Sequence, residues 1–430
     1  MKVVIVGGVA GGATAAARLR RLNEEAEIIV LERTGYVSYA NCGLPYYIGG
    51  TIQDKGALTL QTPESFRARF NIDVRVKNEV LSVQPEEHTV TVRRLEDGSE
   101  YTETYDKLIL SPGAKAIRPP LPGIDLEGIF TLRTVEDTFR IRNFLERERP
   151  KSAVVVGGGF IGLEMAENLI HAGVRTTMIQ LDDQVLLPLD KDLAGEVHAY
   201  LQGQGLDLRL STAVTGFRRR GGKLEALIGE QPPVEADLVI LAIGVAPESD
   251  LARRAGLTLG QKGAIVVDEH MRTSHPDIYA VGDAVELTHA VTGQKALVAL
   301  AGPANRQGRV AADHICGLNQ GYAGAQGSSI LKLFDMTAAA TGLNERSAKA
   351  AGVAYDKAVT YSASHATYYP GARNMTVKTL FDPATGRILG AQIVGFDGVD
   401  KRIDVLATAI RAGLTARQLT ELDLAYAPPY

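Results

Sequence analysis

The chain has 430 residues and a formal net charge of −4, with 46 Lys and Arg against 50 Asp and Glu. This balance gives no electrostatic reason to expect a nucleic-acid partner. Hydrophobic residues make up 45% and charged residues 22%, the composition of a soluble globular protein, and the length suggests about two to four domains. Two cysteines are too few for a disulfide framework, and they fit a reducing compartment.

The N-terminus, "MKVVIVGGVAGG", has a lysine and a short apolar run that ends at glycines. An export signal needs a longer apolar stretch, and here arginines follow instead, so we interpret the segment as mature structure. No later segment approaches the roughly 18 consecutive apolar residues of a membrane span. We therefore expect a cytoplasmic protein that does not contact the membrane.

The first predicted unit is a strand, a glycine-rich turn, a helix and a second strand. Val3–Val6 is a short apolar strand, and the second strand, "EIIVLE", ends at Glu32. In dinucleotide-binding units the glycines let backbone approach a pyrophosphate at the helix N-terminus, and the acid bonds a ribose. Read as G-x-G-x-x-G, Gly7 and Gly12 fit, but Val9 stands at the second glycine position. An ordinary strand-to-helix turn stays an alternative on this evidence alone.

A second unit of the same kind begins at residue 153. "AVVVGGGFIGLEMAE" sets Gly157, Gly159 and Gly162 in full G-x-G-x-x-G register between an apolar strand and a helical pattern. Two such units in one chain suggest two bound dinucleotides.

The residues after the second unit bear on the choice of nicotinamide cofactor. Its last strand ends near Gln180, where an NAD-binding unit often has a carboxylate. Gln180 can bond a ribose hydroxyl, whereas Asp182 and Asp183 would repel a 2′-phosphate, and no arginine in "QLDDQVLLP" would hold one. We expect NADH in preference to NADPH, with NADPH left open.

A third signal is "TSHPDIYAVGDAVE", a strand over 278–281 followed by Gly282 and Asp283. A turn is the simplest interpretation of Gly-Asp by itself. The pattern also resembles the second flavin-contacting signature of flavoproteins with two dinucleotides, in which the aspartate bonds the ribityl chain.

Taken together, these segments resemble the FAD- and NAD(P)H-dependent pyridine nucleotide-disulfide oxidoreductases over nearly the whole chain. The motifs that carry the resemblance are "GGVAGGATAAAR", "SYANCGLPYYIGG", "GGGFIGLEMAE", "YAVGDA", "LAGPANRQGR", "HATYYPGA", "GVDKRIDV" and "AYAPPY". The chain is most similar to the single-cysteine branch, which holds coenzyme A-disulfide reductases, NADH-dependent persulfide reductases, and NADH oxidases and peroxidases. Tyr47 stands where the two-cysteine branch has its second cysteine, so a dithiol mechanism is not expected.

The resemblance implies an α/β fold with two Rossmann-like dinucleotide-binding domains and an α+β C-terminal dimerisation domain. We expect the FAD-binding domain at residues 1–115 and 247–324, the NAD(P)H-binding domain at 116–246 and the dimerisation domain at 325–430. It also implies a homodimer with shared active sites. Whether the natural chain continues past Tyr430, for example into a rhodanese domain, stays open.

Cys42 is the catalytic residue that the resemblance implies. A lone thiol without context is more often inert. Between two nucleotide units and at an expected helix N-terminus, the helix dipole and the flavin would favour its thiolate. Cys316 has no such setting. Tyr368 and Tyr426 match tyrosines that reach across the dimer toward the reactive sulfur, although Tyr369 competes with Tyr368 for the first match.

The same resemblance assigns the remaining site residues. Those expected to bind FAD or NAD(P)H are Gly7, Gly8, Ala10, Gly11, Gly12, Glu32, Arg33, Val80, Gly113, Arg133, Gly157, Gly159, Phe160, Ile161, Gly162, Gln180, Asp283 and Ala301. Those expected to bind coenzyme A are Thr14, Arg18, Arg21, Ser38, Asn41 and Asn305, although a solvated helix face is the simpler interpretation of the two arginines. No metal site is expected.

The implied function is reduction of coenzyme A disulfide, or CoA persulfide, by NAD(P)H through FAD and a mixed disulfide at Cys42. Three alternatives stay open. The first is an NADH-dependent persulfide or polysulfide reductase that uses the same cysteine. The second is an NADH oxidase or peroxidase in which Cys42 cycles through a sulfenic acid. The third, from another class, is a flavoprotein electron donor to a protein partner.

Overall fold

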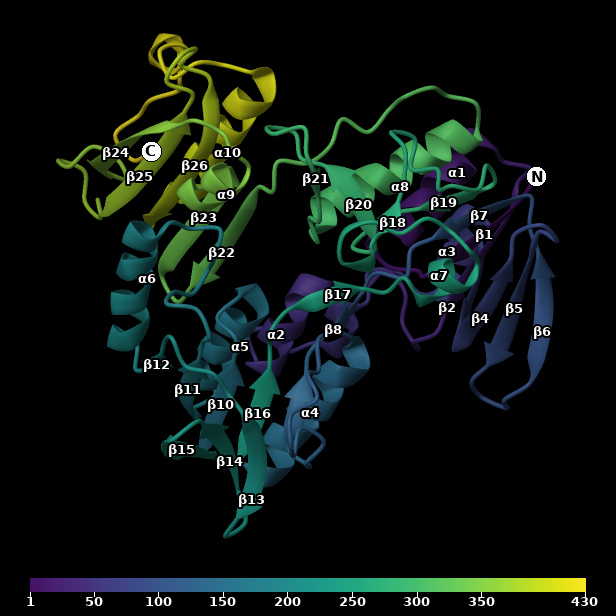
Figure 1. Ribbon diagram of the computed structural model, residues 1–430, viewed down its shortest axis with the longest axis horizontal. Helices are drawn as coiled ribbons and strands as arrows, with labels where there is room; N and C mark the ends of the chain where they lie inside the picture. The colour runs from purple at the N-terminus through teal and green to yellow at the C-terminus, as the bar shows by residue number, and fades with distance from the viewer.

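A five-stranded parallel sheet with β1 at its centre organises the N-terminal part of the chain. The computed structural model describes residues 1–430 (Figure 1). In β1 the apolar residues Val3–Val6 are buried, as expected for a central strand of a parallel sheet, and only Lys2 at its start is partly exposed. The strand order is β19 (Ile278–Ala280), β7 (Lys107–Leu110), β1 (Lys2–Val6), β2 (Glu27–Glu32) and β3 (Asp73–Val76). We call this sheet and its coverings the first lobe.

Two long helices pack together on the first lobe. They are α1 (Ala10–Leu22) and α8 (Ala301–Ile315), which come from opposite ends of this part of the sequence. A Cβ at Gly308 would lie 2.4 Å from the Gly11 carbonyl oxygen, so only glycine permits this approach of the two helices. The lobe is completed by β4 (Asn78–Gln84), β5 (Thr89–Arg94), β6 (Glu100–Thr104), β18 (Ile265–Val266), β20 (Val285–Thr288), β21 (Lys295–Ala296), α3 (Pro63–Phe70) and α7 (Asp250–Arg254).

A second five-stranded parallel sheet forms a separate lobe, which lies at the bottom of Figure 1. Its order is β12 (Asp207–Arg209), β11 (Arg175–Ile179), β10 (Ser152–Val156), β16 (Leu238–Leu241) and β9 (Ile129–Thr131). This second lobe also contains α4 (Val135–Glu148), α5 (Phe160–His171), α6 (Lys191–Gly203) and a meander of β13 (Gly216–Arg220), β14 (Lys223–Ile228) and β15 (Gln231–Ala236). The chain enters and leaves it through an antiparallel pair, β8 (Ala114–Ala116) and β17 (Val245–Pro247).

The C-terminal part forms a third lobe around an antiparallel sheet, at the upper left of Figure 1. The sheet order is β22 (Ser329–Leu333), β23 (Met336–Gly342), β26 (Ile388–Gly395), β25 (Asn374–Phe381) and β24 (Asp356–Ala363), accompanied by α9 (Glu345–Ala350) and α10 (Val399–Ala412). The predicted class, two Rossmann-like units and an α+β C-terminal part, is confirmed. No helix is both long enough and apolar enough to cross a bilayer.

A buried lysine joins the third lobe to the second. Lys378 on β25 is 0% exposed, and its Nζ lies 3.0 Å from Asp190, 2.8 Å from Asp192 and 2.6 Å from Glu345. The two aspartates lie at the start of α6 and the glutamate at the start of α9. Burying an ammonium group is costly unless carboxylates surround it, so this cluster fixes how the two lobes meet.

Candidate active site

The first glycine turn lies at the carboxyl end of β1, where the strand order of the sheet reverses. In open α/β sheets ligands bind at such switch points. Val9 is the N-cap of α1 and makes no side-chain capping bond, and the first turn of α1 contains no acidic residue. The first amides of the helix are therefore available to an anion. A Cβ at Gly12 would lie 1.9 Å from the Gly7 carbonyl oxygen, which explains the glycine at that position.

The second glycine turn repeats this geometry at the carboxyl end of β10. Gly159 is the N-cap of α5, without a capping side chain and without an acid in the first turn. A Cβ at Gly162 would lie 1.9 Å from the Gly157 carbonyl oxygen, whereas one at Gly159 would contact nothing. The middle glycine is therefore not required by the protein's own packing, and Val9 can occupy the same position in the first turn. Both turns fit a bound pyrophosphate.

In each dinucleotide unit, the side chain at the end of the second strand accepts a hydrogen bond from an amide of the glycine turn. Glu32 is 6% exposed, and its two carboxylate oxygens accept hydrogen bonds from the amides of Gly8 (2.9 Å) and Thr34 (2.8 Å). In the second lobe, Gln180 Oε1 accepts the amide hydrogen of Gly158 at 2.8 Å. Arg33, next to Glu32, forms a two-pronged ion pair with Glu248 instead of projecting freely.

Cys42 lies on a short 3₁₀ turn, Asn41–Gly43, which leads into α2 (Leu44–Ile48). The residue is exposed, but Leu44 and Ile48 are buried in the hydrophobic core of the second lobe. The helix α2 contacts α5, which begins directly after the second glycine turn. The Cys42 turn therefore belongs to the N-terminal segment in sequence and packs against the second dinucleotide unit in space.

Arg133 joins the Cys42 turn to two other predicted elements. Its Nη2 donates to Asp283 at 2.8 Å, and its Nε donates to the Ala114 carbonyl oxygen at 3.0 Å. In the amide orientation that satisfies both side-chain atoms, Asn41 donates to the Arg133 carbonyl oxygen at 3.1 Å and accepts from Arg133 Nη1 at 3.2 Å. A Cβ at Gly113 would lie 3.2 Å from the guanidinium. Arg133 thus connects Asp283, the first crossing strand and the residue beside Cys42.

The electrostatics around Cys42 correct one expectation. Burial by neighbouring atoms, and then the carboxylate of Glu164, raise the pKa of the Cys42 thiol, and the guanidinium of Arg133 only partly opposes them. The helix that follows has five residues and supplies only a small dipole. The protein by itself therefore favours the thiol at this position, not the thiolate.

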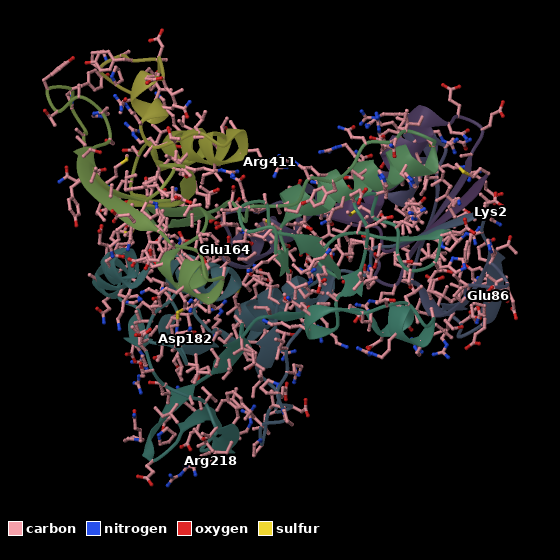
Figure 2. The ribbon with its side chains drawn as sticks, turned by 45° about the horizontal axis from the view of Figure 1, so that its top comes forward. Lys2, Glu86, Glu164, Asp182, Arg218 and Arg411 are labelled. Atoms are coloured by element: carbon pink, nitrogen blue, oxygen red, sulfur yellow. The ribbon has the colours of Figure 1, made fainter.

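Glu164 is the functional candidate that the sequence analysis missed. It lies on α5, near the centre of the view in Figure 2. Burial, and then the charge of Glu167, raise its pKa to about 7, although a hydrogen bond from Tyr46 opposes the shift. A glutamate in the apolar run "FIGLEMAE" was the available signal. A carboxyl group that titrates near neutral pH beside a cysteine can hold or release a proton during thiol chemistry.

The residues expected to bind coenzyme A gather in part between α1 and α8. Thr14 Oγ1 donates to Asn305 Oδ1 at 2.9 Å, and Arg18 Nε contacts Asp313 at 2.6 Å. Arg18 therefore already has a buried carboxylate partner and is not a free cation. Arg21 is exposed, with its guanidinium 6.0 Å from the Phe70 ring.

The structure gives the positions of three other residues that were expected to bind a ligand. Ser38, at a φ of 46°, donates its amide hydrogen to Gly8 at 2.8 Å and so lies beside the first glycine turn. Val80 is 7% exposed on β4. Ala301 opens α8. The structure positions them and does not by itself assign them a ligand.

Tyr368 and Tyr426 are brought together in the third lobe. Their hydroxyl oxygens lie 2.8 Å apart, and the two residues are 74% and 71% exposed. Neither hydroxyl is hydrogen-bonded to the Cys42 turn of the same chain. The pair thus presents two phenols on the surface of the C-terminal lobe.

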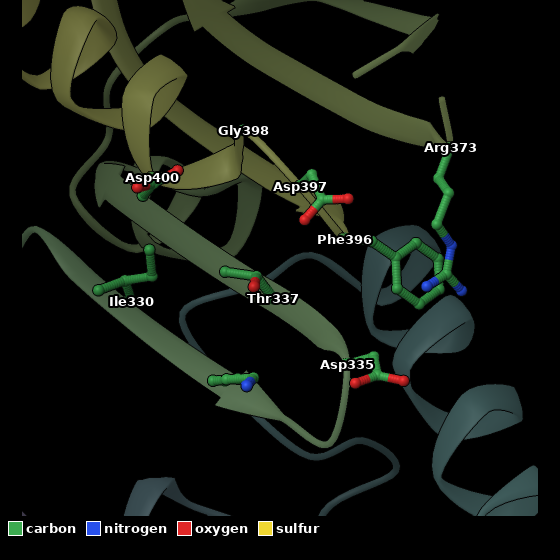
Figure 3. A pocket seen from close by; sticks show the side chains of 9 residues that line it. Ile330, Asp335, Thr337, Arg373, Phe396, Asp397, Gly398 and Asp400 are labelled. Carbon is green, nitrogen blue, oxygen red and sulfur yellow. The ribbon is translucent and has the colours of Figure 1, made fainter. Parts of the chain in front are cut away.

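The third lobe also carries a cavity of about 530 Å³. Figure 3 shows Arg373 beside the Phe396 ring, and the guanidinium carbon lies 3.1 Å from the ring centroid. Its lining mixes acids with bases: Ile330, Lys332, Asp335, Thr337, Arg373, Phe396, Asp397, Gly398 and Asp400. None of the predicted site residues lines it.

Comparison with known proteins gives the family. The pyridine nucleotide-disulphide oxidoreductase pattern matches residues 1–359, and the dimerisation domain of the same family matches residues 328–430. A coenzyme A disulfide reductase of Staphylococcus haemolyticus is 36% identical over 430 residues, covering 100% of this chain and 96% of the relative.

Two solved structures are also similar over the full length of the chain. Reduced CoADR-RHD of Bacillus anthracis has 48% identity and a TM-score of 0.98, covering 100% of this chain and 77% of the other. A NAD-dependent persulfide reductase from A. fulgidus has 41% identity and a TM-score of 0.97, covering 100% and 80%. With its two glycine turns, its cysteine turn and its dimerisation domain, the chain belongs to the pyridine nucleotide-disulphide oxidoreductases and is an enzyme.

Proposed function

We propose that the chain is an FAD-dependent NAD(P)H:disulfide oxidoreductase that reduces coenzyme A disulfide, or CoA persulfide, through Cys42. The observation that carries the proposal is the position of the cysteine turn. It packs on α5, directly after one dinucleotide turn, and Asn41 and Arg133 connect it to Asp283. A single thiol between two proposed dinucleotide sites, with Tyr47 in place of a second cysteine, suits a mixed disulfide with a small thiol.

The first lobe is the proposed FAD-binding domain, residues 1–115 and 247–324, and residues 116–246 are the proposed NAD(P)H-binding domain. The first glycine turn would hold the FAD pyrophosphate, with Glu32 at the ribose and Asp283 at the ribityl chain. The turn at Gly157–Gly162 would hold NADH. FAD, when bound, supplies the two-electron chemistry that connects a hydride donor with a sulfur acceptor.

The proposed role of Cys42 is nucleophilic. Its thiolate attacks one sulfur of the disulfide, a bond forms between Cys42 and that sulfur, and the other half leaves as a thiolate. Two electrons that originate from NADH then cleave the mixed disulfide, which releases the second thiolate and restores Cys42. Tyr368 and Tyr426 of a second copy, presented by the dimerisation domain in residues 325–430, would donate hydrogen bonds to the leaving sulfur.

Coenzyme A suits the cationic and polar side chains around α1. Thr14, Arg18, Arg21, Ser38, Asn41 and Asn305 are the proposed contacts. The phosphates would have to share Arg18 with Asp313, which holds the guanidinium at 2.6 Å.

A persulfide or polysulfide reductase is the second candidate function. It is favoured by the 41% identity to a persulfide reductase over the whole chain. In that reaction the thiolate of Cys42 would attack the outer sulfur of a persulfide, and the leaving group would be the parent thiolate.

Mass spectrometry of the untreated protein tests these assignments. A coenzyme A adduct on Cys42 that dithiothreitol removes supports the first function, and one added sulfur atom supports the second. Added oxygen would instead indicate the oxidase or peroxidase chemistry of a sulfenic acid.

Replacement of the two cysteines completes the test. We expect Cys42→Ser to abolish disulfide-dependent NADH oxidation without preventing reduction of the flavin by NADH. Cys316→Ser is the matched control, because that thiol lies at the end of α8, and it should retain full activity. Unchanged turnover in Cys42→Ser would favour an electron donor to a protein partner.

A further inference from the structure

We propose that Glu167 is a positioning residue for the chemistry of Cys42, because its carboxylate, held by a hairpin of the C-terminal lobe, controls the protonation of Glu164 beside the cysteine. The inference rests on the proposed function, in which Cys42 is the nucleophile, and deepens it. It follows from contacts that cross from the third lobe to α5 and run along one face of that helix to the cysteine turn.

The hairpin between β22 and β23 packs against the second lobe, where β22 contacts α5 (Figure 1). The amide of Phe334 at its tip donates to Glu167 Oε1 at 2.8 Å, and the amide of Asp335 donates to the Tyr200 hydroxyl at 3.1 Å. The Phe334 ring centroid lies 5.1 Å from that of His171 and 6.4 Å from that of Tyr200. The third lobe therefore holds a carboxylate of α5 through a backbone group.

The backbone of Phe334 adopts a conformation that an aromatic residue rarely takes. Its φ is 53°, in the left-handed region that favours glycine, and the residue is half-buried. A hairpin tip that only connected two strands would favour Gly or Asn at this position. Strain of this kind persists where neighbouring contacts hold it, here the two rings and the bond to Glu167. The tip therefore keeps Glu167 in one position.

Glu167 lies in the interior with only one of its oxygens hydrogen-bonded. The residue is 6% exposed, and its Oε2 is buried without a hydrogen-bond partner. Burial raises the pKa of Glu167, whereas the amide of Phe334 and the charges of His171 and Lys332 lower it. These three groups favour the carboxylate. Because no donor binds Oε2, the negative charge acts strongly on neighbouring groups in the low-dielectric interior.

Glu164 is the group on which this charge acts. It precedes Glu167 by three residues, so the two side chains share one face of α5. The charge of Glu167 is the second cause, after burial, of the raised pKa of Glu164, and a hydrogen bond from Tyr46 of α2 opposes the shift. The helix α2 packs closely on this face of α5, since a Cβ at Gly49 would lie 2.1 Å from Asn168 Oδ1.

Glu167 influences Cys42 through Glu164 and not directly. The charges that act on the Cys42 thiol are those of Glu164, Arg133 and Asp283, and Glu167 is not among them. A protonated Glu164 does not oppose ionisation of the thiol, whereas its carboxylate does. The carboxylate of Glu167 therefore determines the pH at which Glu164 begins to oppose the Cys42 thiolate.

The test measures iodoacetamide alkylation of Cys42 as a function of pH in the holoenzyme, with Cys316→Ser as the background. In this background the profile should change slope near pH 7, where Glu164 ionises. Glu167→Gln keeps an oxygen for the Phe334 amide but removes the charge. The change of slope should then move down by about one pH unit, and alkylation at about pH 6.5 should be about two- to threefold slower.

A double-variant cycle separates this role from a structural one. In the Glu164→Gln background, Glu167→Gln should alter the alkylation rate by less than about 1.5-fold, because the group through which it acts is absent. Phe334→Gly is the matched control for the packing of the hairpin. It loses the ring, keeps the amide donor and suits the positive φ, so the profile should stay where it is.

Three results would overturn the inference while leaving Cys42 as the nucleophile. They are a profile that Glu167→Gln does not change, an equal shift when Glu164 is also replaced, and an equal shift in Phe334→Gly, which would make packing the cause. Full disulfide-dependent turnover in Cys42→Ser would instead refute the proposed function itself. Equal flavin content and melting temperature in the two glutamine variants and their parent verify folding.

Discussion

Arg133 and Asp283 form an ion pair, 2.8 Å between Nη2 and Oδ2, although 150 residues separate them in sequence. The same guanidinium contacts the crossing strand at Ala114 and the amide of Asn41 beside Cys42. One planar group with several donors thus connects Asp283 with the turn that carries Cys42. A lysine has one cationic nitrogen and cannot make these contacts together.

Arg133→Lys should therefore weaken the retention of FAD. It should also slow the alkylation of Cys42, but by a smaller factor than that by which it lowers turnover. We expect FAD affinity to fall by about tenfold, because a hydrogen bond to a charged group contributes about 1.5–3 kcal/mol. The ratio of flavin to protein absorbance after dialysis measures it. Arg147→Lys, an exposed residue paired with its neighbour Glu148, is the control and should retain its flavin. Full flavin retention in Arg133→Lys would contradict the role assigned to this contact.

The second prediction concerns pH. Glu164 has a pKa of about 7, and its negative charge is one cause of the raised pKa of Cys42. As pH rises through about 7 the carboxylate forms and opposes ionisation of the thiol. Glu164→Gln removes that charge, so the Cys42 thiolate should form at lower pH. The rate of iodoacetamide alkylation as a function of pH measures this, and at pH 8 it should rise on the order of threefold to tenfold.

An exposed acid provides the comparison for that experiment. Glu148→Gln removes a charge at the end of α4 and should leave the alkylation profile of Cys42 where it is. If Glu164→Gln behaved like Glu148→Gln, the carboxyl group would have no electrostatic influence on the thiol.

The two glycine turns could be predicted because each lies within a short segment of sequence, whereas the cysteine turn and the C-terminal dimerisation region were predicted from the resemblance to a known family. Strand, glycine and helix follow one another directly, so local geometry specifies them. The contacts of Arg133 could not be predicted, since its partners come from three distant segments. Glu164 was missed for the same reason: its neighbour Cys42 reaches it only through the packing of α2 on α5.

Lys378 illustrates a second limit. In the alternating pattern "TVKTLFD" a lysine predicts a solvent-facing position, yet the residue is 0% exposed. Its side chain is buried because carboxylates from the second lobe and from α9 meet there, which only the assembled fold reveals.

Lys378→Met should destabilise the protein by about 3–5 kcal/mol, because it leaves three carboxylates close together without a cation. Thermal unfolding followed by circular dichroism measures the loss as a lower Tm. Lys357→Met is the control: it contacts Glu345 alone, its side chain is 44% exposed, and its loss should cost less than about 1 kcal/mol. Equal effects of the two substitutions would mean that the buried cluster does not hold the lobes together.

The same cluster gives a pH dependence with a defined sign. Burial alone would raise the pKa of Glu345, but hydrogen bonds from Lys357, Lys378 and Tyr355 and the charge of Lys378 lower it from 4.5 to about 2. A depressed folded-state pKa stabilises the fold above the unfolded value, and this contribution disappears as pH falls through about 2. Glu345→Gln should therefore lower Tm at pH 7, and the gap from wild type should narrow steadily between pH 4.5 and pH 2. A gap that stays constant over that range would contradict the ion-pair origin.

The tyrosine pair supplies the last prediction. The hydroxyls of Tyr368 and Tyr426 hydrogen-bond each other, which raises the pKa of Tyr368. The raised pKa keeps the Tyr368 hydroxyl protonated at neutral pH, so that it can donate a hydrogen bond. If the pair acts on the leaving sulfur in a second copy, Tyr426→Phe should slow disulfide reduction by about tenfold while flavin reduction by NADH keeps its wild-type rate. Tyr361 on β24 is 76% exposed, and Tyr361→Phe is the control for loss of a surface hydroxyl.

A mixture of Tyr426→Phe and Cys42→Ser subunits tests whether the site is shared between two chains. Only the heterodimer combines a wild-type cysteine of one chain with a wild-type tyrosine of the other. Recovered activity therefore requires the shared site, and no recovery would place both residues in one subunit.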